Sequence, residues 1–301
     1  MSRSVYVNGE FLPEENAKIS VFDRGFLFAD AVYEVFPVLD GGISDADAHL
    51  NRLERSMNEL GFPPHYSAHE YLPILKILLR NNKLEEGLIY IQVTRGMADR
   101  SFDFPKDADP SVVMFTQNVK IADNPKALKG IAVITLPDIR WQRCDIKTVA
   151  LLPACLAKAE AARQGADDAW MLDADGFITE GSSNNAYILT KDGKLITRNL
   201  SNAILHGITR VSTTALAAQS NINVEERPFT IEEAENAQEA FYTSASAFVM
   251  PVVKINGKQI GDGKPGPSTI KLRELVIEAA RKSAGETPAL KKRRRVKTKK
   301  G

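Results

Sequence analysis

The sequence predicts a two-domain protein of the α+β or α/β class, and three observations support this prediction. The chain has 301 residues, which is enough for two hydrophobic cores, since domains hold about 50–200 residues each. Strand-like and helix-like patterns alternate along the chain. No Gly-x-Gly-x-x-Gly turn follows a predicted strand, so we do not expect a doubly wound dinucleotide-binding sheet.

A small N-terminal α/β domain is predicted over residues 1–120, and it opens with a hairpin over Val5–Leu12. Asn8 and Gly9 supply the two positive φ angles of a type I′ turn. Apolar β-type runs predict further strands at residues 31–38, 88–94 and 112–119. Because proline has no N–H to donate, Pro37 must lie at a sheet edge or a bulge.

Two helices are expected between the first two of those strands. Asp47–Leu60 places apolar residues at helical spacing and is followed by a glycine, a common signal for a helix end. A second helix is expected over about residues 68–81, where Ser67 and Glu70 have the spacing of a capping box. Pro73 argues against regular helix in the first turns, because proline removes a helical hydrogen bond.

A larger C-terminal domain is predicted over residues 127–285, after the polar, turn-rich stretch 121–126. Strands are predicted near residues 131–136, 169–172, 186–190 and 195–197, and helices near residues 152–164 and 209–219. Residues 286–301 are expected to form a basic, disordered tail.

The basic residues are distributed unevenly. Eight of the 39 lie in the segment 291–300, and the remaining 31 stand against 38 acidic residues. Such a basic run can bind nucleic acid or an anionic surface. No aromatic or glycine-rich recognition element accompanies it, so we favour a solvated terminus and do not expect nucleic-acid binding.

Composition and cysteine content favour a globular cytoplasmic protein. The chain is 44% apolar and 26% charged, as ordinary globular proteins are. No apolar run approaches the roughly 18–20 residues that cross a bilayer, and the N-terminus lacks the apolar stretch of a secretory signal. Cys144 and Cys155 are the only cysteines, so neither a disulfide framework nor a metal site is expected.

Lys147 is the first candidate for chemistry. It follows the apolar Ile146 in a stretch with few turn residues. Burial there would lower the pKa of the amine and leave it able to attack a carbonyl carbon. The plainer interpretation is an edge-strand lysine whose amine reaches water.

Glu180 is the second candidate. It ends an apolar approach and precedes the small polar residues 181–185, so it is expected to leave a strand for a loop that lines a pocket. A carboxylate in that place can keep an aromatic ring nitrogen protonated. The alternative is a turn in which Ser and Asn side chains bind their own backbone.

Two further segments suit an anion. Gly207 lets the backbone come close, and the helix start after it can bind an anion together with the Thr209 hydroxyl; a plain N-cap would look the same. His49 and Arg52 are three residues apart on one helix face. Arg52 can offer a phosphate two N–H groups, although a solvated helix face is the common role of such residues.

These four segments, in this order, resemble the fold-type IV enzymes that use pyridoxal 5′-phosphate (PLP), most closely the D-amino-acid aminotransferases. The resemblance covers the chain from Tyr6 to about Glu278 and implies their two-domain fold. Its anchors are Tyr6–Phe11, Phe22–Gly25, Ala31–Val35, His49–Leu53, Thr94–Gly96, Arg140–Lys147, Ile178–Asn184, Gly207–Arg210, Ser244–Ser246 and Val249–Val252.

The resemblance implies roles in cofactor binding. Lys147 would join the aldehyde of PLP through its amine and would move the proton of the substrate α-carbon, and Glu180 would partner the pyridine nitrogen. The other cofactor-binding residues implied are Arg52, Ile208, Thr209 and Ser246 for the phosphate and Leu205 for the ring.

The resemblance also implies a substrate site that two copies of a homodimer share. Tyr33 and Arg100 match positions that hold the substrate carboxylate, Arg100 reaching in from the second subunit. Phe102 stands where the D-amino-acid enzymes carry histidine, and it cannot donate a hydrogen bond. Because a charge-assisted hydrogen bond is typically worth about 1.5–3 kcal/mol, weaker binding of the carboxylate is expected. Pro37, where relatives often carry arginine, is a second departure.

The implied activity is PLP-dependent transamination between D-amino acids, of the D-alanine or D-glutamate type, and 2-oxo acids. Three other activities stay open: a branched-chain L-amino acid aminotransferase, an (R)-amine transaminase, which Phe102 favours, and an aminodeoxychorismate lyase. A protein without enzymatic activity, which binds PLP and uses its basic tail on nucleic acid, is the least favoured hypothesis.

Overall fold

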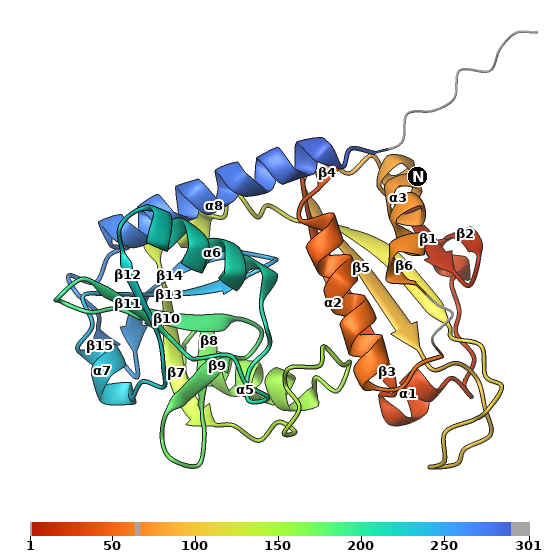
Figure 1. The fold of residues 1–301 in the computed structure, drawn as a ribbon, viewed down its shortest axis with the longest axis horizontal. Helices are drawn as coiled ribbons and strands as arrows, with labels where there is room; N and C mark the ends of the chain where they lie inside the picture. Colours follow the sequence, from red (N-terminus) through yellow and green to blue (C-terminus); the bar gives the residue numbers. More distant parts are fainter. Residues whose placement is uncertain (1, 64–66, 290–301) are drawn as a thin grey trace, which may run out of the picture.

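The computed structural model describes residues 2–63 and 67–289. The chain forms an N-terminal and a C-terminal lobe that lie side by side, and the long helix α8, Pro267–Glu286, crosses over both (Figure 1). The chain passes from one lobe to the other between Asn118, where the first sheet ends, and Ile131, where the second begins. The predicted boundary segment 121–126 lies within this stretch, and its exact limits stay a prediction. The basic run predicted over residues 291–300 lies outside the described residues.

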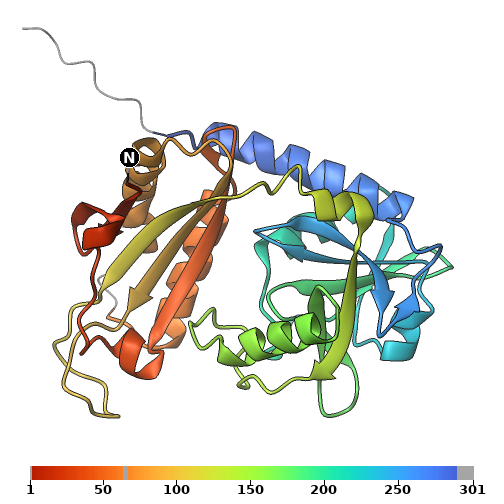
Figure 2. The same ribbon diagram turned by 180° about the vertical axis from the view of Figure 1, so that it is seen from behind.

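The N-terminal lobe is a six-stranded antiparallel sheet with two helices on one face (Figure 2). The strand order is β2-β1-β6-β5-β3-β4. The strands are β1 Ser4–Val7, β2 Glu10–Pro13, β3 Ala31–Leu39, β4 Gly42–Ile43, β5 Gly87–Thr94 and β6 Val112–Asn118. The helices are α2 Ala46–Glu59 and α3 Leu72–Asn82, with the short η1 Glu14–Asn16, α1 Arg24–Phe28 and η2 Ala68–Tyr71 beside them. Apolar side chains of α2 and α3 pack on those of β3 and β5 in one core.

The predicted hairpin and helices of this lobe are confirmed, except at the start of the second helix. Asn8 has a φ of 46° and Gly9 a φ of 104°, as the type I′ turn requires. Helix α3 begins only at Leu72, so a proline lies in its first turn rather than in its interior. The predicted capping box is wrong: Ser67 Oγ donates to Glu54 Oε2 at 3.2 Å, so a carboxylate from another helix takes the hydroxyl.

Pro37 lies where the sheet loses no hydrogen bond. The carbonyl of Pro37 accepts from the N–H of Ser44 at 2.9 Å, so the side of the residue that lacks an N–H faces β4 rather than β5. The two-residue strand β4 pairs only with Val38 and Leu39. The proline is therefore tolerated beside the sheet edge, as the sequence predicts.

The C-terminal lobe is a nine-stranded mixed sheet in the order β12-β11-β10-β13-β14-β7-β8-β9, with β15 paired to β14. Its strands are β7 Ile131–Pro137, β8 Asp168–Leu172, β9 Ile178–Gly181, β10 Asn185–Leu189, β11 Lys194–Thr197, β12 Asn223–Glu226, β13 Glu239–Ser244, β14 Phe248–Ile255 and β15 Lys258–Gln259. Its helices are α4 Pro125–Lys129, α5 Leu152–Arg163, α6 Ile208–Gln219, α7 Ile231–Glu235 and α8. The strands and helices predicted between residues 131 and 219 are confirmed, whereas the elements after residue 220 have no predicted counterpart.

Helix α8 joins the two lobes. Its buried Leu272 and Val276 share a core with apolar side chains of both sheets, among them Leu39 and Phe241. Beyond the end of α8, the N–H of Ile43 in β4 donates to the carbonyl of Thr287 at 3.0 Å. The predicted start of the tail at residue 286 is therefore too early, because residues 287–289 are still paired with the N-terminal lobe.

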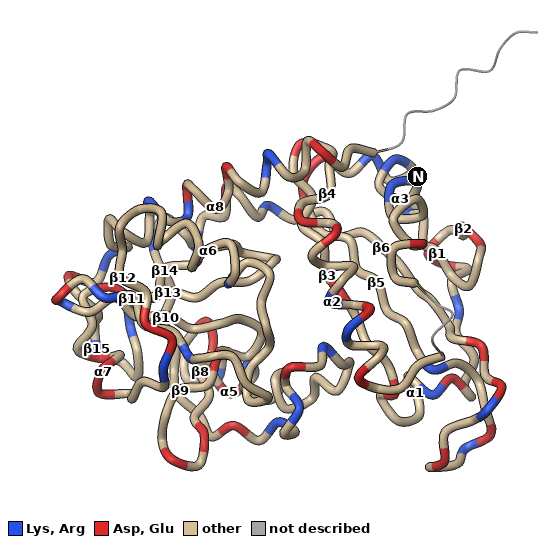
Figure 3. The backbone as a smooth tube through the Cα atoms, viewed as in Figure 1, with Lys and Arg blue, Asp and Glu red and all other residues tan. Residues whose placement is uncertain are grey.

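Acidic and basic residues are spread along the described backbone of both lobes (Figure 3). Among the described residues, no helix combines the length and the apolar character that crossing a bilayer requires. The groups that matter for the site are the few charged side chains buried between the lobes.

Candidate active site

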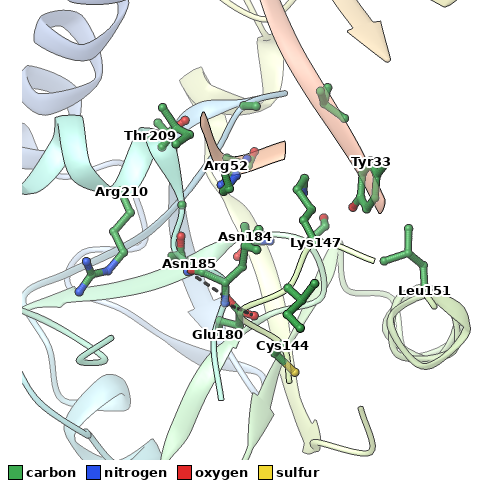
Figure 4. Close-up of a pocket in the computed structure, with 18 of the residues that line it drawn as sticks. Tyr33, Arg52, Cys144, Lys147, Leu151, Glu180, Asn184, Asn185, Thr209 and Arg210 are labelled. Atoms are coloured by element: carbon green, nitrogen blue, oxygen red, sulfur yellow. Dashed lines mark hydrogen bonds between the residues drawn. The ribbon is translucent and has the colours of Figure 1, made fainter. Parts of the chain in front are cut away.

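A cavity of about 860 Å³, which includes space open to solvent, lies between the lobes. Its lining combines apolar side chains with a few polar and charged ones, as is common in small-molecule sites. The N-terminal lobe contributes Tyr33, Val35, His49 and Arg52, and the C-terminal lobe contributes residues of the segments 140–151, 180–185, 205–210 and 243–245. The labelled side chains of Figure 4 surround this space.

Lys147 lies on the segment between β7 and α5, which crosses to the N-terminal lobe. The N–H of Tyr33 donates to the Lys147 carbonyl at 3.0 Å, and the N–H of Val149 donates to the Ala31 carbonyl at 3.1 Å. The Lys147 Nζ lies 4.2 Å from the centre of the Tyr33 ring, and Figure 4 shows its side chain extending between those of Arg52 and Tyr33. The alternative of a lysine on an edge strand is wrong, because Lys147 belongs to no strand. Its half-buried side chain lines the cavity.

Glu180, near the end of β9, is 3% exposed and lines the same cavity. Its Oε1 accepts from Arg140 Nη1 at 2.6 Å, and its Oε2 accepts from Asn185 Nδ2 at 2.8 Å. The N–H of Leu205 donates to both oxygens, at 3.1 and 3.2 Å. Burial raises the pKa of the Glu180 carboxyl, although the Arg140 guanidinium opposes this. The hydrogen bonds therefore fix the position of the Glu180 carboxylate, and a further cation beside it would stabilise its ionised form.

Asn185 and Gly207 are packed against each other beside Glu180. Asn185 Nδ2 also donates to the Leu205 carbonyl at 3.0 Å, so the amide joins the carboxylate to the loop before α6. A Cβ on residue 207 would lie 2.1 Å from Asn185 Oδ1. Only glycine therefore lets this loop approach Asn185 so closely.

Arg52 is fixed by buried partners on the N-terminal side of the cavity. Its Nε and Nη2 donate to the two oxygens of Glu34 at 2.6 and 2.9 Å, and Nη1 donates to the His206 carbonyl at 3.0 Å. His49 Nδ1 lies 2.8 Å from Glu34 Oε2. The alternative of a solvated helix face is wrong, because His49 is buried and only 8% of Arg52 is exposed.

The start of α6 faces the cavity with its N–H groups uncapped. Gly207 occupies the N-cap position, and no side chain caps this helix start. The first N–H groups of a helix have no partner within it and favour an anion. Ile208 and Thr209 line the cavity at this point, and Leu205 lines it next to Glu180.

Three predicted site residues lie outside the cavity lining of the described chain. Ser246 is exposed, with its hydroxyl 3.4 Å from Ser244 Oγ, and the lining ends at Thr243, Ser244 and Ala245. Arg100 is exposed with its guanidinium 5.7 Å from the centre of the Phe102 ring, and Phe102 is 82% exposed. Their assigned roles stay predictions.

Sequence reasoning assigns no role to Glu34, Arg140 or Asn185, although each binds a residue of the cavity. Glu34 carried a usable signal: it is a charged residue inside the apolar strand 31–39, where a buried charge needs a partner. Arg140 lies 40 positions before its partner Glu180. A pair so far apart in sequence is not recognised by any local motif.

Known proteins similar to this chain are aminotransferases. The family described as amino-transferase class IV matches residues 31–255. The D-alanine aminotransferase of Staphylococcus aureus (strain N315) is 40% identical over 273 residues, which cover 90% of this chain and 95% of that protein. The D-alanine aminotransferase of Bacillus licheniformis is 37% identical over 265 residues, which cover 88% of this chain and 93% of that protein.

Solved structures with the same fold include branched-chain amino acid aminotransferases. The enzyme of Escherichia coli has a TM-score of 0.86 and 25% identity, over 95% of this chain and 96% of the other. The enzyme of Thermoproteus uzoniensis, solved with norvaline, has a TM-score of 0.83 and 26% identity, over 95% of this chain and 96% of the other. With a family match over more than half of its length, the chain belongs to the class IV aminotransferases.

Proposed function

We propose that this chain uses PLP to transfer the amino group of a D-amino acid, such as D-alanine, to a 2-oxo acid. The cofactor part of the proposal is carried by one observation: a lysine amine, a buried carboxylate and an uncapped helix start line the same cavity. The substrate part is supported by the 40% identity to a D-alanine aminotransferase over 90% of the chain.

The residues of the cavity fit PLP, which has a ring nitrogen, an aldehyde and a phosphate. Glu180 is buried, and the raised pKa of its carboxyl means that a cation beside it would be favourable. Lys147 offers the cavity an amine that suits the aldehyde. The start of α6, with Ile208 and Thr209, and the guanidinium of Arg52 suit the phosphate.

When bound, PLP supplies an aldehyde that an amine can join and a protonated ring that withdraws an electron pair from the carbon next to the amino group. Glu180 would hold the proton of the ring nitrogen through a charge-assisted hydrogen bond. The amine of Lys147 would take the proton from the substrate α-carbon at Nζ and return it, acting first as a base and then as an acid. Tyr33, whose ring lies against Nζ, would limit the directions that the amine can take.

The proposed substrate site is completed by a second copy of the chain. Phe26 and Phe102 are 73% and 82% exposed, and Leu152 is 70% exposed. Because aromatic residues are enriched at protein–protein interfaces, we expect a homodimer that covers them and brings Arg100 to the neighbouring cavity, where Arg100 and Tyr33 hold the substrate carboxylate.

A branched-chain L-amino acid aminotransferase is the second candidate, because solved enzymes of that name share this fold at 25–26% identity. The higher identity to D-alanine aminotransferases makes it the weaker proposal. The (R)-amine transaminase hypothesis rests on Phe102 alone. The aminodeoxychorismate lyase hypothesis rests on the shared fold alone.

The test is to load the purified chain with PLP and to follow the visible absorption band of the cofactor as single amino donors are added. D-alanine should remove the band, and 2-oxoglutarate should then restore it. Removal by L-leucine but not by D-alanine would favour the branched-chain activity, and removal by (R)-amines alone would favour the amine transaminase. Catalytic release of pyruvate from aminodeoxychorismate without an amino acceptor would indicate the lyase.

Lys147→Ala is expected to abolish turnover, because no other lining residue offers an amine among the described residues. Lys126→Ala, which changes an exposed lysine paired with Asp167 at 2.7 Å, is the control and should turn over like the unmodified chain. Equal turnover of the two variants would contradict the role of Lys147.

A further inference from the structure

Arg140 links two carboxylates at the side of the cavity. Its Nη1 donates to Glu180 Oε1 at 2.6 Å, and its Nε and Nη2 donate to the two oxygens of Asp138 at 3.0 and 2.7 Å. Nη2 also reaches the carbonyl of Ala203 at 3.3 Å. A bidentate contact fixes the plane of a guanidinium, so Arg140 cannot turn away from Glu180 without breaking its bonds to Asp138.

Asp138 is a charged anchor for this arginine. Besides its bonds with the Arg140 guanidinium, Asp138 accepts from Thr179 Oγ1 at 2.9 Å and from the backbone N–H of Arg140 at 3.1 Å. Burial opposes the ionisation of Asp138, but its hydrogen bonds with Arg140 outweigh that effect and hold the pKa of the carboxyl below its usual range. Asp138 therefore stays ionised and keeps its pairing with Arg140.

The three side chains together leave one negative charge uncompensated. Asp138 and Glu180 carry two negative charges and Arg140 carries one positive charge, while the three side chains are only 4–14% exposed. An excess charge in such a place is costly unless a partner is supplied. Of the two carboxylates, Glu180 is the one that lines the cavity, so a cationic group of a ligand there could compensate the charge.

We propose that Arg140, anchored by Asp138, is a positioning residue that keeps Glu180 ionised and turned toward the ring nitrogen of bound PLP, and so keeps the ring protonated. This inference rests on the proposed function, since it assigns a role toward that cofactor. Arg140 contacts the Glu180 carboxylate directly, at 2.6 Å, whereas a ring nitrogen bound to Glu180 would have the carboxylate between itself and Arg140. The charge of Arg140 therefore lowers the basicity of the carboxylate more than that of the ring nitrogen. Without Arg140 the shared proton moves from the ring nitrogen to the carboxylate.

The experiment uses PLP that is isotope-labelled at the ring nitrogen, bound to the full chain, with the nitrogen NMR chemical shift as the readout. The main variant is the double substitution Asp138→Asn with Arg140→Met, because removing Arg140 alone would also leave Asp138 as an unpaired buried ion. In the double variant, Glu180 alone loses its cationic partner. Its ring nitrogen should shift toward the value of a neutral pyridine, and PLP should dissociate faster. The kcat for D-alanine should fall about 10- to 100-fold, as when residues that orient a functional group are lost, with KM changed little.

Two further variants separate positioning from general damage. Arg140→Lys keeps a cation next to Glu180 and should keep the ring nitrogen largely protonated. Arg227→Met removes an exposed arginine of the same lobe, paired with Glu233 at 2.7 Å, and should leave the nitrogen shift unchanged. A purely structural role of Arg140 would change stability in the double variant but would leave the nitrogen shift as it is.

The unmodified chain provides an independent check, which holds even if the double variant does not fold. Its ring nitrogen must be protonated at about pH 7, since a neutral ring would leave the buried negative charge without a partner. A neutral nitrogen in the unmodified chain, or a protonated one in the double variant, overturns the role of Arg140 while PLP binding stands. A chain that binds no PLP at all would instead overturn the proposed function.

Discussion

Glu34 is a fully buried carboxyl that is nevertheless ionised. Burial favours the neutral acid, but the charge and hydrogen bonds of Arg52, together with His49, outweigh burial and hold the pKa of Glu34 far below its usual range. The two hydrogen bonds between Glu34 and Arg52 also fix the orientation of the Arg52 guanidinium at the cavity. A single buried acid thus determines where an anion-binding residue points.

Stability should therefore depend on pH through Glu34. Because its pKa in the folded chain lies below the unfolded value of about 4.3, the ionised carboxyl stabilises the fold fully above that pH, and this contribution is lost as the pH falls further. Glu34→Gln should lower the free energy of unfolding at neutral pH by about 3 kcal/mol, the usual cost of breaking a buried ion pair, and should weaken its pH dependence in acid.

Urea unfolding at neutral and acidic pH measures this effect. Glu14→Gln is the control, because Glu14 forms an exposed pair with Arg3 at 2.8 Å, and such pairs are worth only about 0–1 kcal/mol. Equal losses of stability in the two variants would show that Glu34 is not a buried partner of Arg52.

Phe102 is the residue at which substrate binding is expected to differ from that of the D-amino-acid enzymes. Phe102→His restores a hydrogen-bond donor at an exposed position, so the fold should not change. The KM for D-alanine should fall about 10-fold or more, which corresponds to a charge-assisted bond of about 1.5–3 kcal/mol. Steady-state kinetics with D-alanine and with an amine lacking a carboxylate test this, since only the KM for D-alanine should change.

At the residue scale, the sequence predicts the residues that face the cavity better than the residues that hold them. Lys147 and Glu180 stand in recognisable motifs, and both line the cavity. Arg140 acts through Glu180, a partner 40 positions away that only the folded chain brings close, whereas Asn185 lies in the same motif as Glu180 but gives no sign of which side chain it binds. Ser246 and Arg100 match a motif but lie outside the lining of one described copy.

At the scale of elements, the start of α6 depends on the close approach of its N-cap glycine to Asn185. Gly207→Ala would put a Cβ 2.1 Å from Asn185 Oδ1, so the loop and the amide that binds Glu180 must move apart. Overpacking of this kind costs about 1–3 kcal/mol, and PLP affinity should fall roughly 10-fold. A titration of the purified variant with PLP measures this loss of affinity.

Gly285→Ala is a matched control for that substitution. Residue 285 lies in α8, and a Cβ there meets no atom within 4 Å. Alanine also favours a helix over glycine, so PLP affinity should stay the same and stability should not fall. An equal loss of affinity in both variants would contradict the packing argument at Gly207.

Local patterns predict most elements before residue 220 but miss α8. Its buried Leu272, Val276, Ala280 and Ala284 recur every four residues, and Pro267 stands at its start, so the signal for a helix was available. The capping box at Ser67 fails for the opposite reason: the local pattern is present, but Glu54 from α2 takes the hydroxyl. The local sequence around Ser67 cannot predict that a carboxylate from another helix binds its hydroxyl.

At the scale of the whole molecule, Arg273 of α8 fixes the link between the lobes. Its two Nη atoms donate to the carbonyls of Ala247, Val249, Ile121 and Ala122 at 2.6–2.8 Å. Ile121 and Ala122 belong to the segment that leads from one sheet to the other, and Ala247 follows the loop that lines the cavity. One side chain thus holds the linker and one wall of the cavity in place.

Arg273→Met should lower the free energy of unfolding by about 3 kcal/mol or more, because four buried carbonyls lose their donor. Arg281→Met, on the exposed part of α8 near Asp40, should change it by less than about 1 kcal/mol. Urea unfolding compares the two, and similar values would contradict the role of Arg273. The sequence predicts the two-lobe fold. It does not predict these hydrogen bonds of Arg273, because the carbonyls that accept them lie more than 20 residues away along the chain.

The bond proposed between the amine of Lys147 and PLP can be trapped chemically. The PLP-loaded protein is reduced with borohydride, which makes the bond between amine and cofactor permanent, and its peptides are then examined by mass spectrometry. We expect the cofactor on the peptide that contains Lys147 and on no other peptide. A cofactor on a different lysine, or on none, would show that Lys147 does not bind PLP.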